Sequence, residues 1–219
     1  MPTPEVLSLP VTNLVRPQAL DPFDRIGVSV AYRAGEEIFA QGDEGETVYR
    51  VLSGAVRASR LLSDGRRQIS GFYYGCDLFG LETDQNRHAS AEALTDARVL
   101  VVRRTCLRHY GALGESLERA LWRATGEALT RAQEHMMLIA RKSALERVAG
   151  FLDDMAERLG GGWVDLPMAR QDIADFLGLT IETISRMLTQ LQQDGVVQFD
   201  GCRRFRISAP ARMADLVAA

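Results

Sequence analysis

One stretch near the end of the chain decides the fold: it reads RQDIADFLGLTIETISRMLTQLQQDG from Arg170 to Gly195. The pattern predicts helices over residues 170–177 and 181–192, joined by a short turn that contains Gly178. Two helices joined in this way form a helix-turn-helix. Thr180 is suited to begin the second helix, because its hydroxyl can accept a hydrogen bond from a free N–H group of the first turn.

The flanking segments extend this motif to a winged domain. Ser143 and Glu146 have the spacing of a capping box, which predicts a helix over residues 143–159 that ends at three successive glycines. Residues 163–166 predict a short strand, and residues 196–199 and 203–207 predict a hairpin around a turn that contains Gly201. We therefore predict a winged helix-turn-helix domain over residues 142–219.

The second helix of this motif carries side chains that can read DNA. Glu182 and Arg186 are four residues apart and share one outward face with Ser185. In a major groove, arginine donates two hydrogen bonds to guanine and glutamate accepts one from cytosine. We predict that Glu182, Ser185 and Arg186 read bases; a surface ion pair without a DNA role is the alternative.

Positive charge for the DNA backbone is local, because the chain as a whole has a net charge of −3. Residues 143–219 contain 8 arginines and 11 acidic residues. The dense basic patch is Arg203, Arg204 and Arg206 on the predicted hairpin, which looks suited to phosphate contacts; a solvated wing face is the alternative. We expect backbone contacts from the following residues: Thr180, Arg170, Thr183, Arg203 and Arg204.

The first half of the chain has a different pattern. From residue 28 to about residue 103, short runs of Val, Tyr, Phe and Ile are separated by glycines, which is typical of an all-β sandwich or barrel. Asp64-Gly65 marks one tight hairpin turn. Residues 1–24 are rich in proline and predict an extended arm, so we assign the β domain to residues 25–112.

One long helix is predicted between the two domains, over residues 113–141. Two apolar strips run along it, and one can pack on the β domain. The other has spacings of three and four residues, as in a coiled-coil seam, and predicts a homodimer; a core helix in a larger domain is the alternative. The residues that we expect to form the dimer seam are Trp122, Leu129, Ala132, Met136 and Ile139.

Patterns typical of enzymes, metal sites and membrane proteins are missing. The three cysteines and three histidines are scattered, and there is no glycine-rich phosphate loop or nucleophile motif. No apolar run approaches the roughly 20 residues of a membrane helix, and the N-terminus is not a secretory signal. We expect no catalytic residues, no metal, no membrane association and a cytoplasmic location.

The chain from about residue 23 to residue 209 resembles the CRP/FNR superfamily of bacterial transcription regulators, and most of all its FixK branch. The resemblance rests on IFAQGDEGETVYRVLSG from Ile38 to Gly54 and on LTIETISRML from Leu179 to Leu188. It implies an α+β fold: an N-terminal β-roll (a jelly roll similar to cyclic-nucleotide-binding domains), a long dimerisation helix and a C-terminal winged helix-turn-helix. It also implies a homodimeric activator of low-oxygen, denitrification or nitrogen-fixation genes that acts with RNA polymerase on double-stranded palindromic DNA with TTGA-type half-sites.

Departures from the family bear on cofactors. No cysteine precedes Cys76, whereas the resemblance to FNR would imply an N-terminal cysteine cluster that holds an iron–sulfur centre. The cyclic-AMP regulators carry Gly-Glu and, about ten residues later, a phosphate-clamping arginine; here Leu81 follows Gly80, and Arg87 comes too early. We therefore expect no cofactor. A regulator gated by an unidentified effector, or by redox chemistry at Cys76, Cys106 or Cys202, is the alternative.

Overall fold

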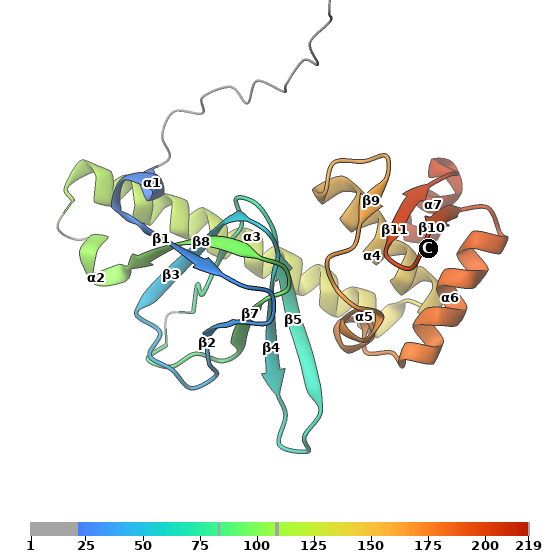
Figure 1. The fold of residues 1–219 in the computed structure, drawn as a ribbon, viewed down its shortest axis with the longest axis horizontal. Helices are drawn as coiled ribbons and strands as arrows, with labels where there is room; N and C mark the ends of the chain where they lie inside the picture. The colour runs from blue at the N-terminus through green and yellow to red at the C-terminus, as the bar shows by residue number, and fades with distance from the viewer. Residues whose placement is uncertain (1–21, 83, 108–109, 219) are drawn as a thin grey trace, which may run out of the picture.

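The computed structural model describes residues 22–82, 84–107 and 110–218. It has two halves joined by a long helix (Figure 1). Most of the expected arm, and His109, lie outside the described residues.

The first half is a β-roll made of two four-stranded antiparallel sheets, with strand orders β1-β8-β3-β6 and β2-β7-β4-β5. Phe39, Val51, Val56 and Phe79 come from both sheets and share one core, so the sheets pack face to face. Gly65 has φ 83°, as the predicted tight turn between β4 and β5 requires. The strands are β1 Val28–Tyr32, β2 Glu37–Phe39, β3 Thr47–Ser53, β4 Val56–Leu61, β5 Arg67–Tyr73, β6 Leu78–Phe79, β7 Ser90–Ala93 and β8 Ala97–Arg103.

The long helix is α3, Ala112–Arg141 (30 residues), preceded by the short helices α1, Pro22–Ile26, and α2, Arg104–Leu107. One side of α3 packs on the β-roll through Leu117 and Leu121, which are buried with Val48 and Leu100. The helix therefore uses one of its two predicted apolar strips within this chain.

The second half is the predicted winged helix-turn-helix. Ser143 begins α4 with the expected capping box, and Gly178, in the left-handed conformation, ends α5. The wing is a three-stranded sheet of order β10-β11-β9, and its first strand is shorter than the sequence suggested. The elements are α4 Ala144–Arg158, β9 Val164–Asp165, α5 Arg170–Leu177, α6 Ile181–Gln193, β10 Val197–Asp200, β11 Arg204–Ile207 and α7 Pro210–Ala218.

The two halves share one hydrophobic core rather than packing as separate units. Ile69, Phe72 and Tyr74 on or beside β5 belong to the same buried cluster as Phe151 of α4 and Ile173 of α5. The first helix of the helix-turn-helix therefore lies against the β-roll, as Figure 1 also shows for β5 and α5.

A buried carboxylate sits at this interface. Asp172 of α5, with 5% of its side chain exposed, accepts hydrogen bonds at Oδ1 from Arg57 of β4 (2.6 Å) and Arg67 of β5 (2.7 Å). Its Oδ2 accepts one from the N–H of Ala169 (3.1 Å), at the start of α5. One side chain thus satisfies a free backbone donor of the helix and links the two halves.

One arginine makes several hydrogen bonds at the junction of α3 and α4. Arg147 donates to the carbonyl oxygens of Ile139 (2.6 Å), Lys142 (2.9 Å) and Leu177 (3.2 Å). These carbonyls lie at the C-terminal ends of α3 and α5, where helices lack internal partners. Lys142, the single lysine of the chain, donates to the carbonyl of Val217 in α7.

His135 of α3 adds a ring contact to the same region. Its imidazole stacks on Phe176 of α5, with ring centroids 4.1 Å apart and planes 22° from parallel. Burial lowers the pKa of His135 below its usual 6.5, although a hydrogen bond with the Phe176 backbone acts in the opposite direction. The folded protein therefore favours the neutral ring.

Replacing Asp172 should destabilise the protein strongly. Asp172→Ala leaves Arg57 and Arg67 without their shared carboxylate at a largely buried site, and we expect a loss of about 3–5 kcal/mol in the free energy of unfolding, measured by urea denaturation. The control is Glu115→Ala, because the Glu115–Arg119 pair on α3 is exposed (73% and 71%). It should cost less than about 0.5 kcal/mol. Equal losses would contradict this account of the interface.

The neutral His135 ring should make stability depend on pH. Its folded-state pKa is lowered, so its contribution is present above the unfolded pKa and is lost as pH falls through the folded pKa. We expect the thermal midpoint to drop between about pH 7.5 and about pH 5.5, and His135→Gln to reduce that drop. His88→Gln, at an exposed histidine, is the matched control; the same pH dependence in all three proteins would rule out this origin.

Candidate nucleic-acid interface

Helix α6 presents the predicted reading residues to solvent. Ile184, Leu188 and Leu191 are buried, so the opposite face of the helix is free. Glu182 and Arg186 on that face are exposed, and Ser185 is half-buried. Figure 1 shows α6 at the outer edge of the C-terminal half, where a ligand as large as a duplex can approach it.

A chain of hydrogen bonds runs across the first turns of α6. The Thr180 hydroxyl accepts from the Thr183 N–H (3.3 Å), as predicted for the cap, and lies 3.1 Å from the Thr183 hydroxyl. Arg186 Nη2 donates to Thr183 Oγ1 (3.3 Å). The backbone N–H of Glu182, the Thr180 hydroxyl and the charge of Arg186 lower the pKa of Glu182, so this carboxylate is ionised at neutral pH.

Arg170 lies at the start of α5 and reaches the second helix. Its Nη1 donates to Ser185 Oγ (3.3 Å). The structure thus brings together Ser185, expected at a base, and Arg170, expected at the DNA backbone. The Ser185 proton stays available to an acceptor outside the protein.

Arg203 and Arg204 of the wing differ in how closely carboxylates approach them. Arg203 is exposed in the turn between β10 and β11. Arg204 lies 3.6 Å from Asp200 and 4.0 Å from Asp165, and its guanidinium is 5.5 Å from the centre of the Trp163 ring. Two carboxylates thus offset the charge of Arg204, which favours Arg203 as the stronger phosphate contact.

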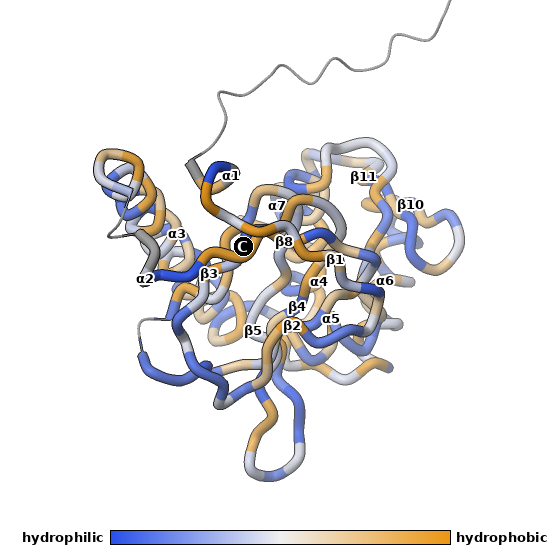
Figure 2. Tube along the Cα trace, turned by 60° about the vertical axis from the view of Figure 1, so that its left-hand side comes forward, coloured by the Kyte–Doolittle hydropathy of each residue, from blue (hydrophilic) through white to orange (hydrophobic). Residues whose placement is uncertain are grey.

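The expected dimer seam lies on the side of α3 that the β-roll leaves open. Trp122, Leu129 and Met136 are 78%, 60% and 61% exposed, Ala132 is exposed and Ile139 is half-buried. Figure 2 shows hydrophobic segments recurring along α3. An apolar stripe of this length on a soluble surface typically marks an interface.

Arg87, the arginine nearest in sequence to the phosphate clamp of the cyclic-AMP regulators, is bonded to groups of the protein itself. The Arg87 side chain is fully buried, pairs with Glu82 (3.1 Å) and donates to the carbonyl oxygens of Gly80 and Thr47. Its guanidinium also lies 4.4 Å from the centre of the Phe39 ring. With its charge offset by a carboxylate and its two terminal nitrogens bonded to carbonyl oxygens, Arg87 does not fit a phosphate-binding role.

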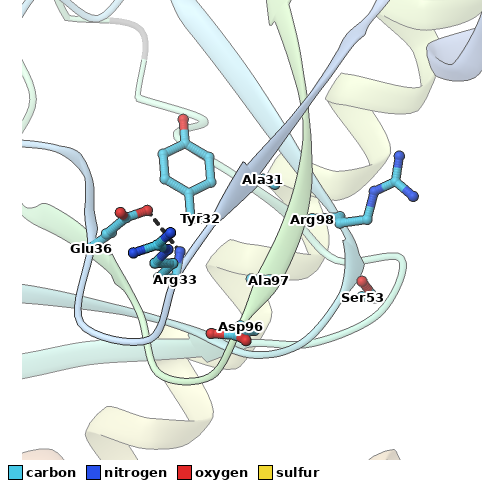
Figure 3. A pocket seen from close by; sticks show the side chains of 8 residues that line it. All are labelled: Ala31, Tyr32, Arg33, Glu36, Ser53, Asp96, Ala97 and Arg98. Atoms are coloured by element: carbon cyan, nitrogen blue, oxygen red, sulfur yellow. Dashed lines mark hydrogen bonds between the residues drawn. The ribbon is translucent and has the colours of Figure 1, made fainter.

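A surface depression elsewhere on the β-roll lacks the character of a ligand site. Tyr32, Arg33, Glu36, Asp96 and Arg98 line it, at the edge formed by β1 and β8. In Figure 3, Arg98 and Tyr32 lie on opposite sides, and Glu36 is engaged by Arg33, whose backbone N–H donates to it (2.7 Å). These polar groups do not converge on a common point.

The described ranges contain two exposed cysteines and no cluster of metal ligands. Cys76 and Cys202 are exposed, the latter as expected at the wing turn, while the side chain of Cys106 is outside the description. Within the same ranges, no group of three or more His, Cys, Asp or Glu side chains is placed to hold a metal ion. None of the described helices has the length and apolarity that crossing a membrane requires.

Sequence analysis did not identify the residues that attach α5, the first helix of the helix-turn-helix, to the rest of the protein. Asp172, Arg57, Arg67 and Arg147 bear no recognisable motif. One local signal existed for Asp172: it stands three residues after Ala169, the position from which an acidic side chain caps a helix start.

Comparison with known proteins agrees with this geometry. Two family models match the chain: a Crp-like helix-turn-helix domain over residues 146–216 and a cyclic nucleotide-binding domain over residues 29–111. The nitrogen fixation regulation protein FixK of Rhizobium meliloti (strain 1021) is 44% identical over 186 residues, which cover 84% of this chain and 85% of the relative. The chain belongs to the CRP/FNR family of transcription regulators.

Other members of the CRP/FNR family support the fold and the kind of activity. The transcriptional activatory protein AadR of Rhodopseudomonas palustris is 37% identical over 222 residues (98% of this chain and 91% of the relative). The solved structure of FixK2 from Bradyrhizobium japonicum has a TM-score of 0.83 and 43% identity, covering 89% of this chain and 98% of that chain. The predicted β-roll, long helix and winged helix-turn-helix are thereby confirmed, and these relatives are regulators rather than enzymes.

Proposed function

We propose that this protein is a homodimeric transcription activator of the FixK type, which binds double-stranded palindromic DNA with TTGA-type half-sites in the cytoplasm. The observation that carries the proposal is the exposure of Glu182 and Arg186 on the first two turns of a capped α6. Recognition helices of this motif meet base edges with their N-terminal residues.

Each predicted residue has a role in this complex. Arg186 donates to guanine O6 and N7, Glu182 accepts from cytosine N4, and Ser185 donates to a neighbouring acceptor. The DNA backbone is bound by Arg170, Thr180, Arg203 and Arg204. Among these, Arg203 carries the most accessible positive charge, since Arg204 is paired with carboxylates.

Two copies are needed to read a palindrome. The seam of Trp122, Leu129, Ala132, Met136 and Ile139 supports pairing of two α3 helices, which would place the two α6 helices about 34 Å apart, one turn of DNA. A surface outside the α3 seam and the α6 helices would contact RNA polymerase at the promoter.

The names of the relatives support a proposal for the genes that this protein controls. FixK of Rhizobium meliloti is named as a regulator of nitrogen fixation and AadR as a transcriptional activatory protein. We propose that this chain likewise activates genes for nitrogen fixation or low-oxygen metabolism. The engaged Arg87 supports DNA binding that does not wait for a cyclic nucleotide.

Base and backbone contacts should respond differently to mutation. Arg186→Ala should cost about 1–3 kcal/mol of binding at a TTGA palindrome and relax the preference at one G·C pair. Arg203→Ala should weaken binding to every sequence and reduce its salt dependence, because a lost phosphate contact releases fewer counterions. The measurement is fluorescence anisotropy with the site and its single-base variants at two salt concentrations. A uniform loss in Arg186→Ala would contradict base reading.

Charges in the seam should separate the dimer. Leu129→Glu combined with Met136→Glu should give a monomer by light scattering and lose affinity for the palindrome, because two pairs of like charges would face each other across an apolar contact. Thr130→Glu, on another exposed side of α3, is the control and should remain a dimer. A dimeric double variant would show that association uses a different surface.

A further inference from the structure

We propose that Thr183 is a positioning residue for base reading: with Thr180 it holds the guanidinium of Arg186 in place before DNA arrives. The proposal rests on the proposed function. It assigns to Thr183 a task that differs from the phosphate contact expected at this position.

The geometry places three side chains in one hydrogen-bonded series. Arg186 Nη2 is 3.3 Å from Thr183 Oγ1, which is 3.1 Å from Thr180 Oγ1. Glu182 and Arg186 form no direct ion pair in the described part of the chain. The hydroxyl of Thr183 is therefore the group that holds the Arg186 guanidinium.

The donors and acceptors of this series are compatible with one another. The Arg186 guanidinium can only donate, so Thr183 Oγ1 accepts from it. Thr183 keeps its own hydroxyl proton, which can be donated to Thr180 Oγ1, the atom that also accepts the Thr183 N–H.

This arrangement suits base reading. Arginine has a long side chain whose rotational freedom is lost on binding, and holding it beforehand lowers that cost. The cap of α6 and the position of Arg186 thus depend on the same two hydroxyls.

Thr183→Val tests the proposal, because valine keeps the shape and β-branching of threonine and removes only the hydroxyl. The quantity to measure is discrimination: the ratio of affinities for the TTGA palindrome and for variants at the guanine read by Arg186. We expect Thr183→Val to lower this ratio roughly threefold to tenfold, the range of one net hydrogen bond. Thr183→Ser, which keeps the hydroxyl, should restore it.

Two controls separate positioning from general damage. Thr189→Val removes another hydroxyl of α6, one that bonds only back to the Ser185 carbonyl (2.9 Å), and should leave discrimination unchanged. Circular dichroism melting of each variant checks the helix itself. In an Arg186→Ala background, Thr183→Val should have no further effect on discrimination if Thr183 acts through Arg186.

The outcomes are distinct. Weaker binding of Thr183→Val to all sequences alike, with the ratio of affinities unchanged, would identify a contact to the DNA backbone and overturn positioning. An additional loss of discrimination in the Arg186→Ala background would overturn it as well. If the unmodified protein shows no preference for the palindrome, the proposed function fails, whereas a preference that survives Thr183→Val defeats only the role of Thr183.

Discussion

The carboxylate of Asp172 is the interaction on which the arrangement of the two halves depends. A buried negative charge is stable only with strong partners, and here it has two arginines from the β4–β5 hairpin and a backbone N–H of its own helix. One carboxylate therefore both caps the start of α5 and attaches this helix to the β-roll. Because α5 packs on α6, this contact helps to set the position of α6 relative to the β-roll. Arg147 acts in a similar way at the other end of α5. It donates hydrogen bonds to carbonyl oxygens at the C-terminal ends of both α5 and α3.

The acidic balance of the chain is compatible with DNA binding because many of its carboxylates are already paired. Asp172 and Asp175 bond Arg57 or Arg67, Asp77 bonds Arg158, and Asp165 and Asp200 lie beside Arg204. These pairs offset negative charge within the protein. Arg186 on α6 and Arg203 at the wing turn remain exposed, as does Glu182, and in a complex with DNA the phosphates would attract these two arginines.

Sequence patterns predicted what is local and missed what is distant. The helices of the helix-turn-helix, the Ser143 and Thr180 caps and the Asp64-Gly65 turn all follow from residues within a few positions of one another. The bonds of Asp172 join residues 115 and 105 positions apart, and no periodicity in the sequence links them. The pairing of Arg204 with Asp165 was missed for the same reason, because the two residues lie on different strands of the wing. The seam on α3 was visible because a heptad pattern is itself local, although its role in pairing is a proposal.

Arginine accounts for all but one of the basic residues, and the structure shows why exchange for lysine would not be neutral. Arg57 holds Asp172 with one nitrogen and Glu92 with another, and Arg147 serves three carbonyl oxygens at once. An ammonium group is a compact point charge and cannot span such separated acceptors. At these positions the geometry therefore calls for one residue type rather than for one charge. An exchange of arginine for lysine, which most protein surfaces tolerate, would here loosen the joint between the β-roll and the winged helix-turn-helix.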